Sequence, residues 1–231
     1  MALFVIADLH LSLGSDKPMD IFPGWDNYLQ KLTYNWKRRV QDGDTVVMPG
    51  DFCWAMGLKG AEEDFAFLHS LPGQKILLKG NHDYWWETRK KMDAFLQQKE
   101  FDSVHILFND SYFCQGVNIC GTRGWTLDEM AQGEEDEKLR RRELGRLKMS
   151  LESVSNPGEI LVFLHYPPIY RDWVSCETID LLHQYGVKRC FYGHLHSKAI
   201  RLAFCGDFEG IHFQLVSADA LKFDPMPIFI E

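Results

Sequence analysis

Short apolar runs alternate with segments of helical period along the whole chain. Apolar runs of four to eight residues predict strands, and apolar side chains recurring every three or four residues predict helices with one buried face. Strands are expected at residues 3–7, 45–48, 75–79, 104–108, 112–114, 117–120, 160–164, 189–192, 200–204 and 211–216. Helices are expected at residues 25–40, 61–68, 87–99, 134–154 and 177–185. This alternation predicts an α/β fold, and because no repeat or linker divides residues 1–231, a single domain is expected.

Polar residues with metal-binding side chains come directly after five of these strands. They are Asp8 and His10, Asp51, Asn81 with His82 and Asp83, His165, and His194 with His196. The carboxyl ends of strands meet at one edge of an open α/β sheet, so these side chains are expected to converge. Glycines at 50, 80 and 193 precede them, where a strand must turn sharply and a Cβ would crowd the site.

The types of side chain in these clusters indicate a metal centre. Five of the nine histidines fall in the clusters, and this concentration argues against isolated structural histidines. Two aspartates, an asparagine and four histidines give seven possible ligands, with His82 left over. Hard oxygen and imidazole donors suit a pair of divalent or trivalent ions such as Mn, Fe or Zn.

The ordered set Asp-x-His, Gly-Asp, Gly-Asn-His-Asp, His and Gly-His-x-His resembles the calcineurin-like metallophosphoesterase superfamily. The resemblance spans residues 8–196 and implies a four-layer α/β/β/α sandwich with mixed sheets. It also implies a role for each ligand. The first ion would be held by Asp8, His10 and His196, the second by Asn81, His165 and His194, and Asp51 would bridge both.

The resemblance implies a dinuclear-metal-dependent phosphohydrolase that cleaves phosphodiester or phosphomonoester bonds of a small substrate. Two ions about 3.5–4 Å apart would clamp a phosphoryl group, and a bridging hydroxide would attack it directly. Asn81 and His82 would contact the substrate, and His82 would protonate the leaving oxygen or steady transition-state charge. Asp83 is expected to orient His82, although an aspartate after a strand can instead cap the following helix.

Three other features bear on the substrate. Arg123 could grip a phosphate oxygen, or it could be a turn residue paired with a nearby acid. Acidic residues early and basic residues late in the helix at 134–154 suit its dipole and favour a solvated helix, with a mobile lid as the alternative. Residues 12–24 form a long loop near Asp8 that could shape the pocket.

The pair Trp54-Ala55 stands where phosphoprotein phosphatases continue the Gly-Asp block into Asp-Arg. This difference argues against protein-phosphatase activity. The arginine that usually binds the phosphate is also missing from that loop, so another residue would have to bind it.

Composition narrows the class of protein further. The net charge of -8 argues against broad electrostatic binding to nucleic acid or to an anionic membrane, and so against a nuclease on the same site. No apolar run approaches the roughly 20 residues that cross a bilayer, and the start of the chain lacks the basic region of a signal peptide. Six scattered cysteines suit the free thiols of a reducing cytosol, so a cytoplasmic protein is expected.

A non-catalytic protein-binding scaffold on this fold is the third alternative, but such a scaffold would be expected to have lost ligands. The physiological substrate and the oligomeric state stay open.

Overall fold

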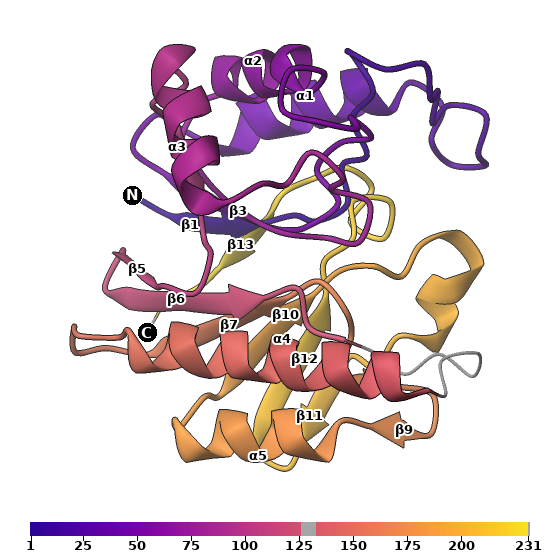
Figure 1. Cartoon of the computed structure of the whole chain (residues 1–231). Helices are drawn as coiled ribbons and strands as arrows, with labels where there is room; N and C mark the ends of the chain where they lie inside the picture. Colours follow the sequence, from indigo (N-terminus) through magenta and orange to yellow (C-terminus); the bar gives the residue numbers. More distant parts are fainter. Residues whose placement is uncertain (126–132, 231) are drawn as a thin grey trace.

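The computed structural model describes residues 1–125 and 133–230 and shows four layers (Figure 1). Two sheets stack face to face, and helices cover both outer faces. The helices α1 (Tyr28–Arg39), α2 (Glu62–Ser70) and α3 (Arg89–Gln98) lie over one sheet. The helices α4 (Glu134–Glu152) and α5 (Cys176–Gln184) lie over the other. This arrangement confirms the expected α/β/β/α sandwich.

Both sheets are mixed, with parallel strands in the middle. The first has the order β13 (Met226–Ile228), β1 (Leu3–Val5), β2 (Thr45–Pro49), β3 (Gln74–Leu78) and β4 (Val104–Ile106). The second has the order β11 (Gly206–Phe208), β12 (Ile211–Leu215), β10 (Arg189–Tyr192), β7 (Ile160–Leu164), β6 (Val117–Thr122) and β5 (Tyr112–Cys114). The strands β13, β11 and β5 pair antiparallel at sheet edges. A small hairpin consists of β8 (Ile169–Tyr170) and β9 (Trp173–Val174).

Side-chain alternation along the strands produces three separate cores. On β1, Phe4 packs under the first three helices, whereas Leu3 and Val5 face the second sheet. On β7, Phe163 lies between the sheets, whereas Val162 packs towards α4 and α5. This two-residue period is the expected consequence of burying a strand on both faces. The stacked sheets therefore hold the ends of their parallel strands in fixed relative positions.

The long helix α4 is part of the outer layer. Leu147 and Leu151 are buried against the second sheet, as their spacing predicts. The hydroxyl of Ser150 donates to the Asp110 carbonyl and accepts from the Gly121 amide at 3.0 Å. These contacts favour a fixed layer over a mobile lid. None of the described helices combines the length and apolarity needed to span a bilayer.

Two expectations about the C-terminal region need correction. The strand expected at residues 200–204 is wrong, because Ser197–Leu202 form a 3-10 helix and the edge strand begins at Gly206. Ala199, Ile200, Ala203 and Phe204 all pack against the second sheet's core, a spacing that suits a helical turn. The strand β13 was not expected, because Pro227 lies within it. Proline is tolerated there because β13 is an edge strand.

A glycine pair tests the close packing between the strands. A Cβ on Gly121 would lie 2.1 Å from the Phe163 carbonyl oxygen, so Gly121→Ala should lower the free energy of unfolding by about 1–3 kcal/mol. Gly145 is exposed within α4 and a Cβ there would meet nothing within 4 Å. Gly145→Ala should therefore raise the same quantity by about 0.5–1 kcal/mol. Urea unfolding followed by circular dichroism measures both, and equal effects of the two variants would contradict the packing described.

Candidate metal centre

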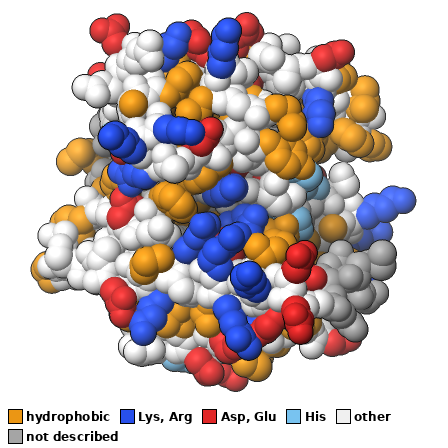
Figure 2. Space-filling view, viewed as in Figure 1, with side chains coloured by type: hydrophobic (Ala, Val, Ile, Leu, Met, Phe, Trp, Pro, Cys, Tyr) orange, Lys and Arg blue, Asp and Glu red, His pale blue; other side chains and the backbone are white. Residues whose placement is uncertain are grey.

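The predicted ligands converge where the two sheets meet. The loops after β1 and β2 run side by side, because the Asp8 amide donates to the Gly50 carbonyl and the His10 amide to the Asp51 carbonyl, each at 3.0 Å. Ala7 also pairs with Ser217 at the end of β12, which joins the first sheet to the second. Figure 2 shows histidine side chains at the surface on the side of the molecule where the strands end. Five loops distant in sequence therefore share one region.

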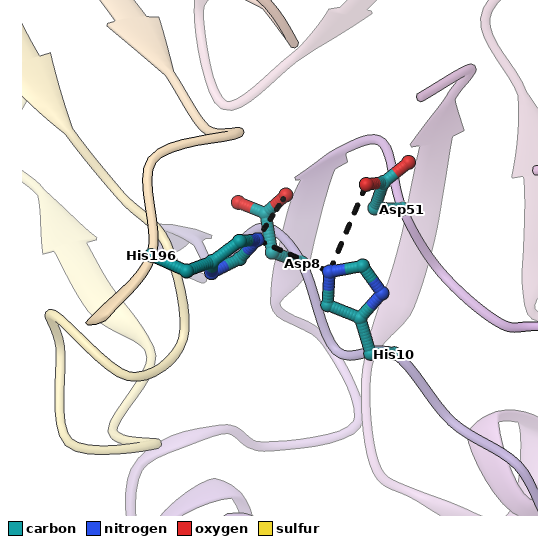
Figure 3. A group of neighbouring side chains, drawn as sticks. All are labelled: Asp8, His10, Asp51 and His196. Carbon is teal, nitrogen blue, oxygen red and sulfur yellow. Dashed lines mark hydrogen bonds and ion pairs between the residues drawn. The ribbon is translucent and has the colours of Figure 1, made fainter. Parts of the chain in front are cut away.

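One group of side chains consists of Asp8, His10, Asp51 and His196, whose potential ligand atoms all lie within 4.8 Å of one another. Figure 3 shows the four side chains pointing towards one another. His196 Nε2 lies 3.4 Å from Asp8 Oδ1, and His10 Nε2 lies 3.7 Å from Asp51 Oδ2. Asp8, His10 and Asp51 are buried. This group could hold one metal ion.

A second group consists of Asn81, His165 and His194. Asn81 Oδ1 lies 2.6 Å from His165 Nε2 and 3.0 Å from His194 Nδ1. Asp51 Oδ2 lies 3.6 Å from His165 Nε2, so this one oxygen faces both groups. All seven predicted ligands are therefore brought together, and the second group could hold another ion.

The oxygen Asp51 Oδ2 is buried and has no hydrogen-bond partner among the described residues. A buried carboxylate oxygen without a partner is costly, because it has lost its water and gained nothing in exchange. His10 Nε2 lies 3.7 Å and His165 Nε2 lies 3.6 Å from this oxygen, both beyond hydrogen-bond distance. Cations between these atoms would satisfy all three, so the residues present fit a metal centre.

Two histidines are oriented by groups behind them. His165 Nδ1 lies 3.1 Å from the Pro49 carbonyl oxygen, which can only accept a hydrogen bond, so the bare nitrogen Nε2 faces the site. His196 Nδ1 lies 3.4 Å from Asp219 Oδ1, which has the same effect. Carbonyl and carboxylate partners of this kind fix the tautomer of metal-binding histidines. Asp219 was not predicted, although it follows the end of β12 as the other site residues follow their strands.

The buried carboxylate of Asp83 holds the metal-site loops together. Its Oδ2 accepts hydrogen bonds from the amides of Gly80 at 2.7 Å and Asp51 at 2.9 Å. Its Oδ1 accepts from the Phe52 amide at 2.9 Å and from Trp85 Nε1 at 3.0 Å, and a longer bond comes from the Cys53 amide. Asp83 therefore positions the backbone that carries Asp51, and not the ring of His82 as the sequence suggested.

His82 lies at the edge of the site, and its amide donates to Asp51 Oδ1 at 2.8 Å. Its ring packs on Trp54 with 4.4 Å between ring centroids, and its Nδ1 lies 3.3 Å from the Tyr84 hydroxyl. The ring is thus held by two aromatic residues, and Tyr84, not Asp83, lies in the position that orients it.

Arg123 lies behind the second group. Its guanidinium is 3.4 Å from Glu143 Oε1 and packs on the Trp125 ring. Its carbonyl accepts hydrogen bonds from the amides of His165 and Tyr166. These contacts support the alternative in which Arg123 pairs with an acid, and its role in substrate binding stays a prediction.

The backbone around the ligands is strained. Asp8, His10, Asp51 and His194 have φ between 46° and 71°, a region that non-glycine residues adopt at a cost. A Cβ on Gly80 would lie 2.1 Å from Asp51 Oδ1, as the sequence suggested. Such strain persists only where surrounding contacts fix the conformation, and here the hydrogen bonds to Asp83 supply several of them.

Burial and nearby charges raise the pKa values of two predicted ligands, Asp51 and His196. Burial, followed by the nearby Asp83 and Asp8 carboxylates, raises the pKa of Asp51 well above its usual range. Burial opposes the charged form of His196, but Asp8 and Asp219 raise its pKa to about 10. Metal ligation requires the opposite states, because a carboxylate and a neutral imidazole bind the ion. The site is thus electrostatically frustrated when only its own side chains are considered.

Replacing Asp83 tests its anchoring role. Each Asp83 oxygen accepts from at least two N–H donors, so either orientation of the Asp83→Asn amide would face an NH₂ group towards donors. We expect the free energy of unfolding to fall by roughly 3 kcal/mol, with lower metal content in the folded protein. Asp93→Asn removes an exposed carboxylate from an ion pair with Arg89 and should change stability by less than about 0.5 kcal/mol. Urea unfolding and metal analysis measure the effects, and similar stability of the two variants would refute the anchoring role.

Comparison with known proteins supports the class of protein that the geometry of the site suggests. The family model described as calcineurin-like phosphoesterase matches residues 1–198. A phosphopantetheinyl hydrolase from Mycobacterium tuberculosis has a similar structure, with a TM-score of 0.59 and 13% identity over 100% of this chain and 96% of that one. A protein of unknown function from Aquifex aeolicus has a TM-score of 0.50 and 14% identity, covering 98% and 95% of the two chains.

No match was found among curated proteins. At such low identity the similar structures establish the fold alone, whereas the family model covers most of the chain. The chain therefore belongs to the calcineurin-like phosphoesterase family of metal-dependent hydrolases.

Proposed function

We propose that the protein is a dinuclear-metal-dependent phosphohydrolase that cleaves phosphodiester or phosphomonoester bonds of a small substrate. The observation that carries this proposal is the position of Asp51 Oδ2, which faces both ligand groups and has no other partner among the described residues. A site for one ion would use only one of the two groups and would not explain why Asn81, His165 and His194 converge beside Asp51. The family membership supports the reaction class.

The residues divide into two ligand sets around a shared carboxylate. Asp8, His10 and His196 would hold one ion, and the second set would hold the other through Asn81, His165 and His194. Asp51 would bridge the two sets. When bound, the ions supply an activated water and neutralise the phosphoryl charge. Mn, Fe and Zn all suit this mixture of carboxylate, amide and imidazole donors.

His82 is suited to deliver a proton to the leaving oxygen. It is sequence-adjacent to Asn81, and its ring is held at the edge of the site by Trp54 and Tyr84. In the protonated ring Nδ1 would donate a hydrogen bond to the Tyr84 hydroxyl oxygen, and the Nε2 proton would pass to the leaving oxygen, which leaves a neutral imidazole. The backbone amide of His82, which binds Asp51, does not depend on this side chain. Proton transfer and ligand positioning can therefore be separated by mutation.

The convergence of all seven ligands supports an enzyme over a protein-binding scaffold. The net charge of -8 supports a small substrate over a nucleic acid, because phosphate-backbone binding needs an extended basic surface. A local pair of cations can still attract one phosphate at short range, where the low dielectric strengthens the interaction.

Metal reconstitution tests the proposal. The protein is stripped with a chelator and then loaded with Mn, Fe or Zn. We expect about two ions per chain, hydrolysis of nitrophenyl phosphate or bis(nitrophenyl) phosphate, and a rise in melting temperature, since bound ions would satisfy the buried donors. Preference for the monoester or the diester narrows the substrate class. Protein that binds two ions but hydrolyses neither probe would favour the scaffold.

Replacing His82 separates chemistry from metal binding. His82→Ala should keep the metal content and lower kcat by about 10²–10⁴-fold, the usual contribution of a general acid. The probe should have a poor leaving group, because nitrophenolate needs little protonation. Leu202 is an exposed residue of the 3-10 helix, and Leu202→Ala serves as a surface control that should keep wild-type turnover. Unchanged turnover in His82→Ala would remove this residue from the mechanism.

A further inference from the structure

We propose that Lys17 binds a second anionic group of the substrate, on the leaving-group side of the scissile phosphate. The preferred substrates would then carry a carboxylate or a further phosphate near the bond that is cleaved. This inference rests on the proposed function and specifies its substrate class.

The position of the Lys17 ammonium is fixed by an aromatic ring. Its Nζ lies over the Trp54 ring, 4.7 Å from the centroid. The same ring stacks on His10, with 4.9 Å between centroids and an interplanar angle of 22°, and packs on His82 at 4.4 Å. One indole therefore contacts the ammonium, a predicted ligand and the proposed proton donor.

The loop that carries Lys17 is attached on both sides of it. The Leu13 amide donates to Asp64 Oδ1 at 2.8 Å, and Trp54 Nε1 donates to the buried Met19 Sδ at 3.3 Å. Pro18 restricts the backbone of the residue before it to extended conformations. The lysine is thus presented from a short tethered segment next to the metal centre.

The charge of Lys17 is not neutralised by an ion pair with any residue in the ranges 1–125 and 133–230. Arg123 differs in this respect, because its guanidinium pairs with the buried Glu143. An ammonium over an aromatic face keeps its hydrogen-bond donors. In a chain with a net charge of -8, an unpaired cation beside the site is well suited to an anionic ligand.

The contacts of Trp54 indicate on which side of the scissile phosphate Lys17 would lie. This ring touches both His82, which we assign to the leaving oxygen, and His10 of the first ligand group, whereas the second ligand group lies around Asn81 and His165. The ammonium over this ring is therefore near His82 and the first ligand group, and we assign this side of the site to the leaving group. An anionic group attached to the leaving group would reach Lys17 while the phosphoryl group stays between the ligand sets.

Two probes that differ by one carboxylate test this assignment. The test measures the hydrolysis of phenyl phosphate and of 3-carboxyphenyl phosphate by Mn-loaded wild type and by the Mn-loaded Lys17→Met variant. We expect kcat/KM for the carboxylate probe to fall about tenfold or more in the variant, mainly through KM, because a charge-assisted contact is lost. The value for phenyl phosphate should stay within about twofold. Lys17→Arg should restore much of the loss, because it keeps the charge.

The matched control is Lys31→Met. Lys31 also places its Nζ over an aromatic ring, that of Phe223 at 5.9 Å, so the variant removes the same kind of contact elsewhere. It should leave both probes at wild-type values. Circular dichroism and metal analysis check that each variant is folded and loaded.

Two results would overturn the inference while leaving the proposed function intact. An equal loss on both probes would place Lys17 at the transferred phosphoryl group or in the fold, and no loss on either would remove it from substrate binding. If metal-loaded wild type cleaved neither probe nor the nitrophenyl esters, the proposed function would fail, and the assignment of Lys17 with it.

Discussion

The hydrogen bonds to the buried Asp83 carboxylate are the interaction on which the candidate metal centre depends. Both oxygens accept from backbone amides on the loops after β2 and β3. These bonds fix Asp51 and Gly80 relative to each other. The amide of His82 in turn donates a hydrogen bond to Asp51 Oδ1. Since a buried carboxylate is stable only when it is fully hydrogen-bonded, the two loops and the carboxylate hold one another in place.

This arrangement also explains how the protein maintains an unfavourable conformation at the site. Four predicted ligands have positive φ, Gly80 has no space for a side chain, and Asp51 Oδ2 lacks a partner among the described residues. Such features are stable only on a rigid scaffold. The stacked sheets provide it, because Leu3 and Val5 of β1 pack directly against the second sheet, which carries His165 and His194. Fold and site are therefore coupled through the core between the sheets.

Much of this could be predicted from the sequence, because the relevant signals are local. The apolar runs gave most strands, and the ligands follow strand ends, so their convergence was expected. Residues 200–204 were misread because Ile200, Leu202 and Phe204 alternate like a strand, whereas their packing is helical. The functions of Asp83, Tyr84 and Asp219 depend on which groups lie beside them in space. A sequence pattern contains the residue types but not those contacts, and the same is true of Lys17 over Trp54.

The central claim is that Asp51 is shared by two ions in a centre built from both sheets. Anomalous diffraction from crystals grown with Mn²⁺ tests it most directly. The account predicts two peaks about 3.5–4 Å apart with Asp51 between them. Asp8, His10 and His196 should surround one peak, and the other should have Asn81, His165 and His194 around it. A single peak, or two peaks that do not share Asp51, would contradict the account.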